Sequence, residues 1–174
     1  SSNREGTPNV YLLAIEGGEA INLSQGKGKD GGFSWSHDGS QILFESDRDG
    51  AKDVFIMGPQ GENIRNLTRS PERRESTPLW SPDGTKLAFY VEDEGGWDIY
   101  VMSFPEGMSQ AVTDTPDVRE FNMSWSPDGD RILFTAKQQG TFDIYVVNLS
   151  SGELFPVTQS DDNNYAPFWV YVTP

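Results

Sequence analysis

In this 174-residue sequence, four residues with oxygen-bearing side chains each lie five residues before a tryptophan. They are Asp30, Glu75, Glu120 and Asn164. Carboxylate and amide oxygens are the ligands that Ca²⁺ and Mg²⁺ prefer, and the mutual repulsion of neighbouring carboxylates favours a bound cation. Two of the acids directly follow an arginine, Arg74 or Arg119, which can neutralise them locally. Two interpretations therefore stay open: a metal site formed by Asp30, Glu75 and Glu120, or an acidic rim in contact with water.

Cysteine and histidine, two residue types that often take part in covalent catalysis, are scarce. The sequence contains no cysteine and one histidine, His37. A Ser-His-Asp triad needs its histidine beside an activated serine, and the Gly-x-Ser-x-Gly segment that often presents such a serine does not occur. We expect His37 to be a solvated turn residue and the protein to be non-enzymatic. We expect no cofactor other than the Ca²⁺ or Mg²⁺ considered above.

The net charge of the chain limits the classes of molecule that it is expected to bind. The formal net charge is −14 at pH 7. Nucleic acids and anionic membrane surfaces are repelled by such a chain, whereas cationic groups and metal ions are attracted. No apolar run approaches the roughly 18 to 20 residues of a membrane-spanning helix, so no membrane insertion is expected. The sequence opens with Ser1 instead of methionine, which suggests a processed or excised product.

An internal repeat positions the candidate residues. Its tryptophans Trp35, Trp80, Trp125 and Trp169 are 45, 45 and 44 residues apart. An Asp-Gly pair follows the first three, with its acid at Asp38, Asp83 and Asp128. A polar residue before an apolar run recurs with nearly the same spacing, at Asn9, Asp53, Asp98 and Asp143. Because these three aspartates stand at the same place in every repeat, we expect them to be structural and to bond a turn amide.

Each repeat reads as four short strands. An opening strand ends at the tryptophan, and strands such as 86–91, 98–102 and 110–113 follow; none of them has a helical period. The Ser-Pro-Asp-Gly segments at 81–84 and 126–129 fit a type I turn, with proline second and glycine fourth. His37 replaces the proline in the first repeat, and we expect the turn to survive it.

Sheets of this size cannot bury two apolar faces alone, so neighbouring repeats must stack, and the radial solution is a β-propeller. We predict an all-β fold of four-stranded antiparallel blades in a single domain, residues 1–174. Blades span about 27–68, 72–113 and 117–158, and a fourth is shared by 1–24 and 163–174. The tryptophans fill the gaps between blades, and the oxygen-bearing residues line one mouth of the central channel.

The number of blades in the complete ring stays open. In one geometry the two ends of the chain meet and close a four-bladed ring, which removes exposed sheet edges. In the other the chain is an arc of a larger propeller, completed by missing sequence or by a second copy in a homodimer.

The repeated motif resembles the WD40-like repeat of TolB-type β-propellers. It is carried by Trp80-Ser81-Pro82-Asp83-Gly84 with Asp98-Ile99-Tyr100-Val101-Met102, and by the matching segments 125–129 and 143–146. The sequence departs from the pattern at His37, at Asn9 and after Trp169, where no Asp-Gly follows. The resemblance implies an extracytoplasmic, periplasmic bacterial protein that serves as a protein-binding platform.

Three functions follow from these observations. The leading one is a non-enzymatic scaffold of the bacterial cell envelope that binds a protein or peptide at the channel mouth. The second is a fragment of the propeller that gates a serine peptidase of the prolyl oligopeptidase type, since such propellers share the repeat. The third is a repeat fragment that self-assembles into a larger ring.

Overall fold

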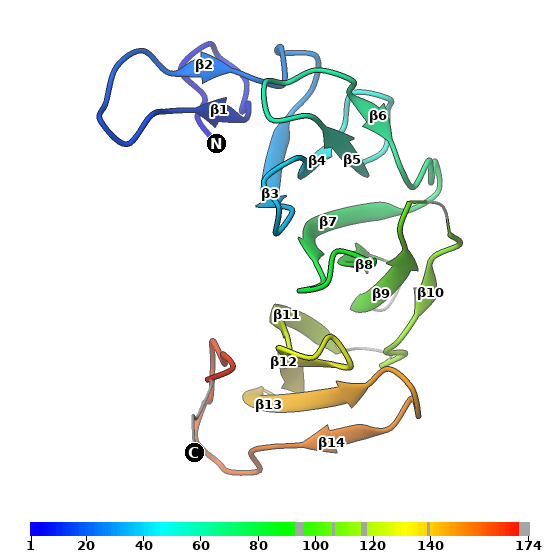
Figure 1. The fold of residues 1–174 in the computed structure, drawn as a ribbon. Helices are drawn as coiled ribbons and strands as arrows, with labels where there is room; N and C mark the ends of the chain where they lie inside the picture. Colours follow the sequence, from blue (N-terminus) through cyan, green and yellow to red (C-terminus); the bar gives the residue numbers. More distant parts are fainter. Residues whose placement is uncertain (93–95, 106, 116–117, 139, 171–174) are drawn as a thin grey trace. The chain divides into compact units, whose positions relative to one another are not determined.

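The computed structural model describes residues 1–92, 96–105, 107–115, 118–138 and 140–170 (Figure 1). The chain divides into two compact units, Ser1–Trp80 and Ser81–Pro174. All regular elements in the described ranges are β-strands, and the sheets are antiparallel apart from one parallel contact. The prediction of an all-β propeller fold is confirmed. No helix long and apolar enough to cross a membrane occurs among the described residues.

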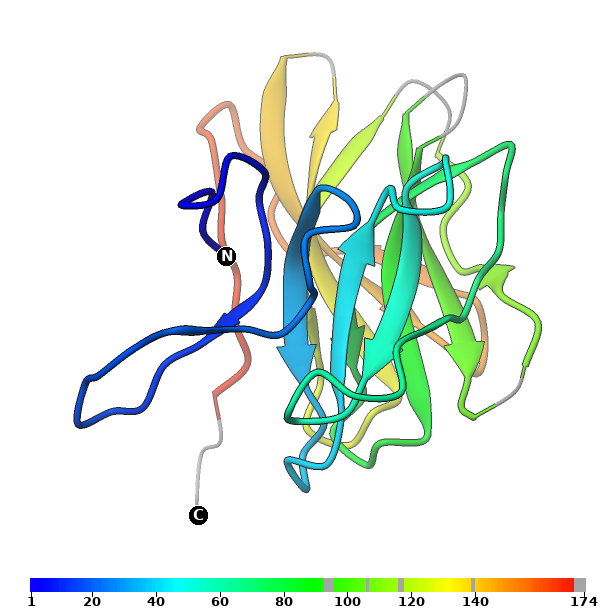
Figure 2. The same cartoon turned by 90° about the horizontal axis from the view of Figure 1, so that it is seen from above.

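The first unit contains a hairpin, a complete four-stranded sheet and one further strand. The hairpin is β1 (Tyr11–Leu12) and β2 (Ile21–Asn22). The sheet has the order β3 (Asp30–Trp35), β4 (Ile42–Ser46), β5 (Asp53–Met57) and β6 (Arg65–Asn66), all antiparallel. The further strand is β7 (Arg74–Trp80). Figure 2 shows β3, β4 and β5 lying side by side.

The second unit contains two groups of antiparallel strands. Its strands are β8 (Lys86–Glu92), β9 (Trp97–Ser103), β10 (Gln110–Ala111), β11 (Arg119–Trp125), β12 (Arg131–Gln138), β13 (Thr141–Asn148) and β14 (Leu154–Pro156). The order β11-β12-β13-β14 forms an antiparallel sheet, and β9 pairs with both β8 and β10. The opening strand β11 also meets β9 in parallel, where Arg119 lies opposite Trp97.

The predicted blade boundaries can be compared with these strands. Strands β3 to β6 fall within 27–68, β7 to β10 within 72–113, and β11 to β14 within 117–158. In the predicted shared blade, β1 and β2 fall within 1–24, while residues 163–170 form no strand. Residues 171–174 lie outside the described residues, and the shared blade stays a prediction.

The Ser-x-Asp-Gly turns form as the sequence indicates. The amide of Gly84 donates to the carbonyl of Ser81 at 2.9 Å, and Gly84 has a φ of 71°, which glycine adopts without strain. The carboxylate of Asp83 accepts bonds from the Ser81 hydroxyl at 2.6 Å and the Thr85 amide at 3.0 Å. These bonds lower the pKa of Asp83 to about 2.

The other two turns match it. In the first repeat, Gly39 donates to Ser36 at 3.0 Å with His37 in the proline position. Its acid, Asp38, also has a pKa lowered to about 2 by the Ser36 hydroxyl and the Ser40 amide. In the third repeat, Asp128 accepts the Ser126 hydroxyl and has a lowered pKa for the same reason.

The tryptophans differ in burial. Trp80 and Trp125 each expose 9% of their surface, whereas Trp35 exposes 41%. Trp169 is half-buried, and its Nε1 donates to the carbonyl of Ser124 at 3.2 Å. The prediction that every tryptophan fills a gap between blades stays a prediction, and Trp35 is the member with the least burial.

Each repeat has one left-handed residue three positions before its tryptophan. These residues are Gly32, Thr77, Asn122 and Ala166, with φ of 41°, 51°, 55° and 51°; in the fourth repeat the offset is also three. In β3 and β11 the register with the next strand shifts there, which identifies a β-bulge. Thr77 is β-branched, so this conformation is strained, and its amide donates to Glu45 at 2.9 Å.

Candidate binding site

The four predicted oxygen positions lie where an opening strand meets the end of the preceding repeat. The backbone makes this junction in a repeated way, because the amide at the oxygen position donates to a carbonyl just before the preceding Asn or Asp. The pairs are Asp30 with Pro8 at 2.8 Å, Glu75 with Lys52 at 2.7 Å and Asn164 with Phe142 at 2.7 Å. We name the four sites the first to fourth junctions, after Asp30, Glu75, Glu120 and Asn164.

A hydroxyl from the preceding repeat completes each junction. It accepts an amide from the start of an apolar strand, as in the bond from Ile99 to Thr113 at 2.8 Å. The equivalent bonds are Val10 to Ser24 at 3.0 Å, Val54 to Thr68 at 3.1 Å and Ile144 to Thr158 at 2.9 Å. Such a hydroxyl has its own proton left to donate to an acid.

The third junction brings two carboxyl groups together. Glu120 exposes 2% of its surface and accepts the hydroxyls of Thr113 at 2.7 Å and Thr115 at 2.9 Å. The Thr115 hydroxyl also lies 3.3 Å from Asp98, so it links the two acids. Burial raises the pKa of Glu120 to about 7, and the negative charge of Asp98 adds to this effect.

The second junction has an equivalent pair of acids, Glu75 and Asp53. Glu75 exposes 1% of its surface, and burial together with the charge of Asp53 raises its pKa, while hydroxyl bonds from Thr68 and Ser70 oppose the rise. Its Oε2 is buried without a hydrogen-bond partner among the described residues. Asp53 accepts the amides of Ser70 at 2.9 Å and of Asn66 Nδ2 at 2.6 Å.

The first junction contains its own cation. The guanidinium of Arg48 forms an ion pair with Asp30 at 3.1 Å, and both side chains are buried. Arg48 Nε donates to Ser46 at 2.9 Å, and the guanidinium carbon lies 5.0 and 5.2 Å from the ring centroids of Phe44 and Phe55. The charge of Asp30 is therefore balanced inside the protein.

The fourth junction replaces the acid by an amide. Asn164 Nδ2 donates to Ser160 at 3.1 Å and to the carbonyl of Asp162 at 3.0 Å, and it lies 3.5 Å from Asp143. Asp143 also accepts the hydroxyl of Thr158 at 2.9 Å. The carboxylate of Asp143 thus faces the hydroxyl of Thr158 and the side-chain amide of Asn164.

The structure places the predicted site residues in buried or half-buried junctions. It brings Glu75 beside Asp53, Glu120 beside Asp98, Asn164 beside Asp143, and Asp30 beside Arg48. Within the described residues, no group of three or more His, Cys, Asp or Glu side chains is arranged to hold a metal ion. The Ca²⁺ or Mg²⁺ site and the binding rim stay predictions.

Two of the three aspartates before the apolar strands, Asp53 and Asp98, bond to turn amides. Asp53 accepts the Ser70 amide at 2.9 Å and Asp98 accepts the Thr115 amide at 3.0 Å, each 17 residues further along the chain. Asn9 accepts the amide of Gly26 in the same way at 2.8 Å. This bond fixes the segment that leads into each junction.

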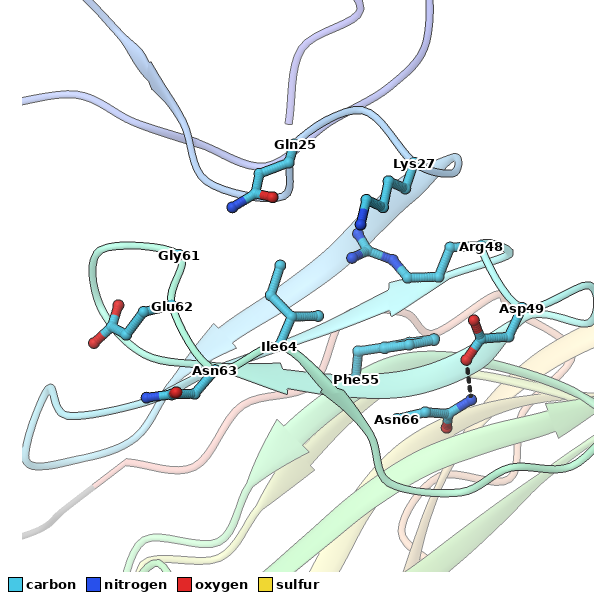
Figure 3. Close-up of a pocket in the computed structure, with 10 residues that line it drawn as sticks. All are labelled: Gln25, Lys27, Arg48, Asp49, Phe55, Gly61, Glu62, Asn63, Ile64 and Asn66. Carbon is cyan, nitrogen blue, oxygen red and sulfur yellow. Dashed lines mark hydrogen bonds between the residues drawn. The ribbon is translucent and has the colours of Figure 1, made fainter.

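A groove opens beside the first junction (Figure 3). It has a volume of about 370 Å³, and it is lined by Gln25, Lys27, Arg48, Asp49, Phe55, Gly61, Glu62, Asn63, Ile64 and Asn66. Figure 3 shows Phe55 and Ile64 in the middle, with Lys27, Arg48 and Asp49 toward one end and Glu62 toward the other. The groove can therefore accept an apolar group between two charged ends.

A smaller pocket lies beside the third junction. Its volume is about 110 Å³, and it is lined by Thr115, Val118, Glu120, Phe134, Ala136, Tyr145 and Leu154. Tyr145 and Leu154 stand 90 residues after Phe55 and Ile64, which line the groove of the first junction. The two cavities are therefore at corresponding places in the first and third repeats.

A family model described as the TolB beta propeller domain matches residues 70–172, more than half of the chain. The chain belongs to the TolB β-propeller family. The resemblance of its repeated motif to that family is thereby confirmed.

Solved structures of TolB have the same fold. A putative TolB from Agrobacterium tumefaciens is 22% identical with a TM-score of 0.76, and the match covers 90% of this chain and 57% of that one. TolB from Acinetobacter baumannii is 20% identical with a TM-score of 0.68, covering 90% and 39%. This TolB-type chain thus spans little more than half of one of these relatives and less than half of the other.

Part of a solved peptidase structure is also similar to this TolB-type chain. A puromycin-hydrolyzing peptidase from Mycobacterium tuberculosis is 15% identical with a TM-score of 0.70, and the match covers 87% of this chain and 27% of that one. At this identity the likeness shows the shared fold alone.

Sequence reasoning missed the partners of the acids in this TolB-type repeat. The largest omission is Arg48, since the corresponding residues of the next two repeats are Asp93 and Gln138. Reading the repeats against one another at every position, instead of only at their shared markers, reveals this difference in charge.

Proposed function

We propose that this chain is a non-enzymatic binding scaffold of the bacterial cell envelope that docks a protein or peptide ligand. The family match supports a TolB-like role, and the groove beside the first junction supports ligand binding. The groove carries the proposal because it combines an apolar floor with amide and charged side chains, the mixture that fixes the orientation of a bound chain. His37 is exposed in a turn, which supports the non-enzymatic assignment.

Affinity capture from a bacterial periplasmic extract tests the scaffold role. The tagged chain should retain a specific protein, and the Lys27→Glu variant should retain less of it, because Lys27 lines the groove and is exposed. Lys29→Glu is the matched control, since Lys29 is exposed, makes the same charge change and does not line the groove. Capture of nothing, or equal capture by the chain and both variants, argues against the proposal.

A second candidate is the gating propeller of a serine peptidase. The likeness to the puromycin-hydrolyzing peptidase favours it. The match covers 27% of that chain, so most of the peptidase lies outside the part that is similar to this chain. This candidate requires an α/β-hydrolase segment with its Gly-x-Ser-x-Gly motif in the same coding sequence. Sequencing the flanking gene decides between the two roles, and a signal peptide found there would support the envelope location.

A third candidate is self-assembly through the hairpin of the first unit. Its residues Leu13, Ile15 and Ile21 are exposed by 57%, 101% and 59%. Apolar side chains on a two-stranded hairpin are stabilised when further strands cover them. Sedimentation equilibrium tests this: a dimer that dissociates in the Ile21→Ser variant supports assembly, and a monomer of 19.4 kDa contradicts it.

A further inference from the structure

Corresponding residues of the first and third junctions form similar aromatic platforms. In the first, Phe44 and Phe55 have ring centroids 5.6 Å apart and an interplanar angle of 33°. Ninety residues later, Phe134 and Tyr145 are 6.0 Å apart at 22°. The acid beside each platform is also at a corresponding position, because Glu120 follows Asp30 by 90 residues.

The two junctions differ in what lies on the platform. In the first, the Arg48 guanidinium lies over both rings and is paired with Asp30. In the third, the residue at the arginine position is Gln138, which carries no charge at any pH and so leaves Glu120 unneutralised. The space beside Glu120, over Phe134 and Tyr145, is a pocket of about 110 Å³.

The charges of the groups around Glu120 are compatible with a bound cation. Among the described residues, the groups that face it are the hydroxyls of Thr113 and Thr115, the carboxyl of Asp98 from β9, and the phenol of Tyr90 from β8. None of these four groups is cationic. Arg119 precedes Glu120 in β11 and is exposed, because successive side chains of a strand point to opposite faces.

We propose that the pocket beside Glu120 binds the guanidinium group of an arginine side chain supplied by a ligand, in the place that Arg48 occupies in the first repeat. The proposal rests on the proposed scaffold role for the source of the arginine, a protein or peptide. The apolar residues Val118 and Leu154, which also line the pocket, suit the methylene stem of the side chain.

Size and chemistry favour arginine over other groups. The pocket is far smaller than the roughly 300 to 1,000 Å³ of sites for drug-sized molecules, so it suits a single side chain. A guanidinium is planar, stacks on aromatic rings and donates two parallel bonds to a carboxylate, whereas an ammonium is a compact point charge. The net charge of −14 attracts cationic ligands over longer distances.

Proton linkage gives the site a recognisable pH dependence. A cation beside Glu120 favours its ionised form, so binding must remove the proton that this carboxyl holds near neutral pH. The pKa of about 7 means that the carboxyl is mostly protonated at pH 6 and mostly ionised at pH 8. Binding should therefore tighten by about tenfold from pH 6 to pH 8.

Calorimetric titration with three small probes tests the proposal. Nα-acetyl-arginine amide should bind saturably and more tightly at pH 8 than at pH 6. The corresponding lysine amide should bind at least several-fold more weakly, and the leucine amide should not bind. Equal binding of the three amides, or arginine binding that ignores pH, overturns the proposal.

Two substitutions locate the site. Glu120→Gln should abolish binding of the arginine amide, because it removes the carboxylate. Gln138→Arg copies the first repeat, so it should abolish binding and raise the melting temperature at pH 8. Lys137→Arg, one residue away in β12, is the matched control and should leave binding unchanged. Undiminished binding in both Glu120→Gln and Gln138→Arg contradicts the proposal.

The same probes separate this inference from the scaffold role. Binding of the arginine amide without capture of any envelope protein would support the pocket and refute the scaffold. Capture of a partner without binding of the arginine amide would support the scaffold and refute the pocket.

Discussion

The first and third junctions bury an acid at the same point of the repeat, and they stabilise it differently. Asp30 is ion-paired with Arg48 over two aromatic rings, whereas Glu120 is held by two threonine hydroxyls beside Asp98. Burying a carboxylate is unfavourable unless it is paired, hydrogen-bonded or protonated. The first junction has a cation beside its acid, whereas burial raises the pKa of the acid in the third to about 7. A shared backbone frame therefore does not determine the charge state of its side chains.

The largest expected effect breaks the first junction. Arg48→Gln leaves Asp30 buried without its cation, and breaking a buried ion pair from one side costs about 3 to 5 kcal/mol. Urea unfolding at pH 7 measures the loss of unfolding free energy. The double variant Asp30→Asn, Arg48→Gln should recover most of it, since neither charge is then buried.

The same variant sharpens the comparison with the third junction. Without Arg48 the first repeat has an acid, an aromatic platform and no internal guanidinium, so Nα-acetyl-arginine amide should raise the melting temperature of Arg48→Gln more than that of wild type. A cost below about 1 kcal/mol for Arg48→Gln would show that the ion pair contributes no more than a surface pair.

The next effect concerns pH and the third junction. The folded pKa of Glu120, about 7, lies above the unfolded value near 4.5, so the folded state binds more protons between these values. Stability is then fully present below about pH 4.5 and falls as the pH rises through 7, by about 3 kcal/mol in total. Urea unfolding from pH 5 to pH 8 measures this slope.

Glu120→Gln should flatten that slope, while Asp30→Asn should keep it. A slope that survives in Glu120→Gln would assign the proton to another group, of which Glu75 is the first to substitute because its pKa is also raised by burial.

A smaller effect comes from the hydroxyl that serves the third junction. Thr113→Val removes the acceptor of the Ile99 amide and the donor to Glu120 while keeping the shape of the side chain. Leaving these buried groups unpaired should cost about 1 to 3 kcal/mol. Because the hydroxyl bond lowers the pKa of Glu120, its loss should also raise that pKa further, which NMR titration of the carboxyl carbon detects.

Thr113→Ser is the control and should recover most of the stability, since it keeps the hydroxyl. Equal losses in the serine and valine variants would attribute the effect to packing of the methyl group.

The smallest effect converts the fourth junction into a pair of acids. Asn164→Asp replaces the amide that donates to Ser160 and the carbonyl of Asp162, and it puts a second carboxyl near Asp143. Because Asn164 is half-buried, we expect a loss of about 1 kcal/mol at pH 8 and less at about pH 3, below the usual pKa of an aspartate. Thermal unfolding at both pH values measures it, and an identical loss at the two pH values would exclude repulsion as the cause.

The sequence predicts the repeat, the strands and the turns because local signals encode them. Glycine in the fourth turn position and the serine hydroxyl on Asp83 are interactions within a few residues. The spacing from the tryptophans also locates the acids of the junctions. Their burial and partners depend on residues from the preceding repeat, such as Thr113 for Glu120, so single-residue patterns do not reveal them.

The bulges show a second limit. Gly32 signals a left-handed residue, but Thr77 and Asn122 hold the same conformation without glycine. Threonine disfavours it, so the conformation at Thr77 is imposed by its surroundings, including the bond from its amide to Glu45. Local propensity alone therefore predicts a straight strand there.

Those bulges determine which residues of an opening strand face the same side of the sheet. Residues five apart in a regular strand face opposite sides, yet Glu120 and Trp125 are both buried, because the extra residue between Phe121 and Ser124 restores an even count. Loss of a single codon in this segment would preserve every neighbouring residue while turning either the acid or the indole outward. Copies of such a unit can therefore diverge freely in residue type but tolerate no change of length within the opening strand.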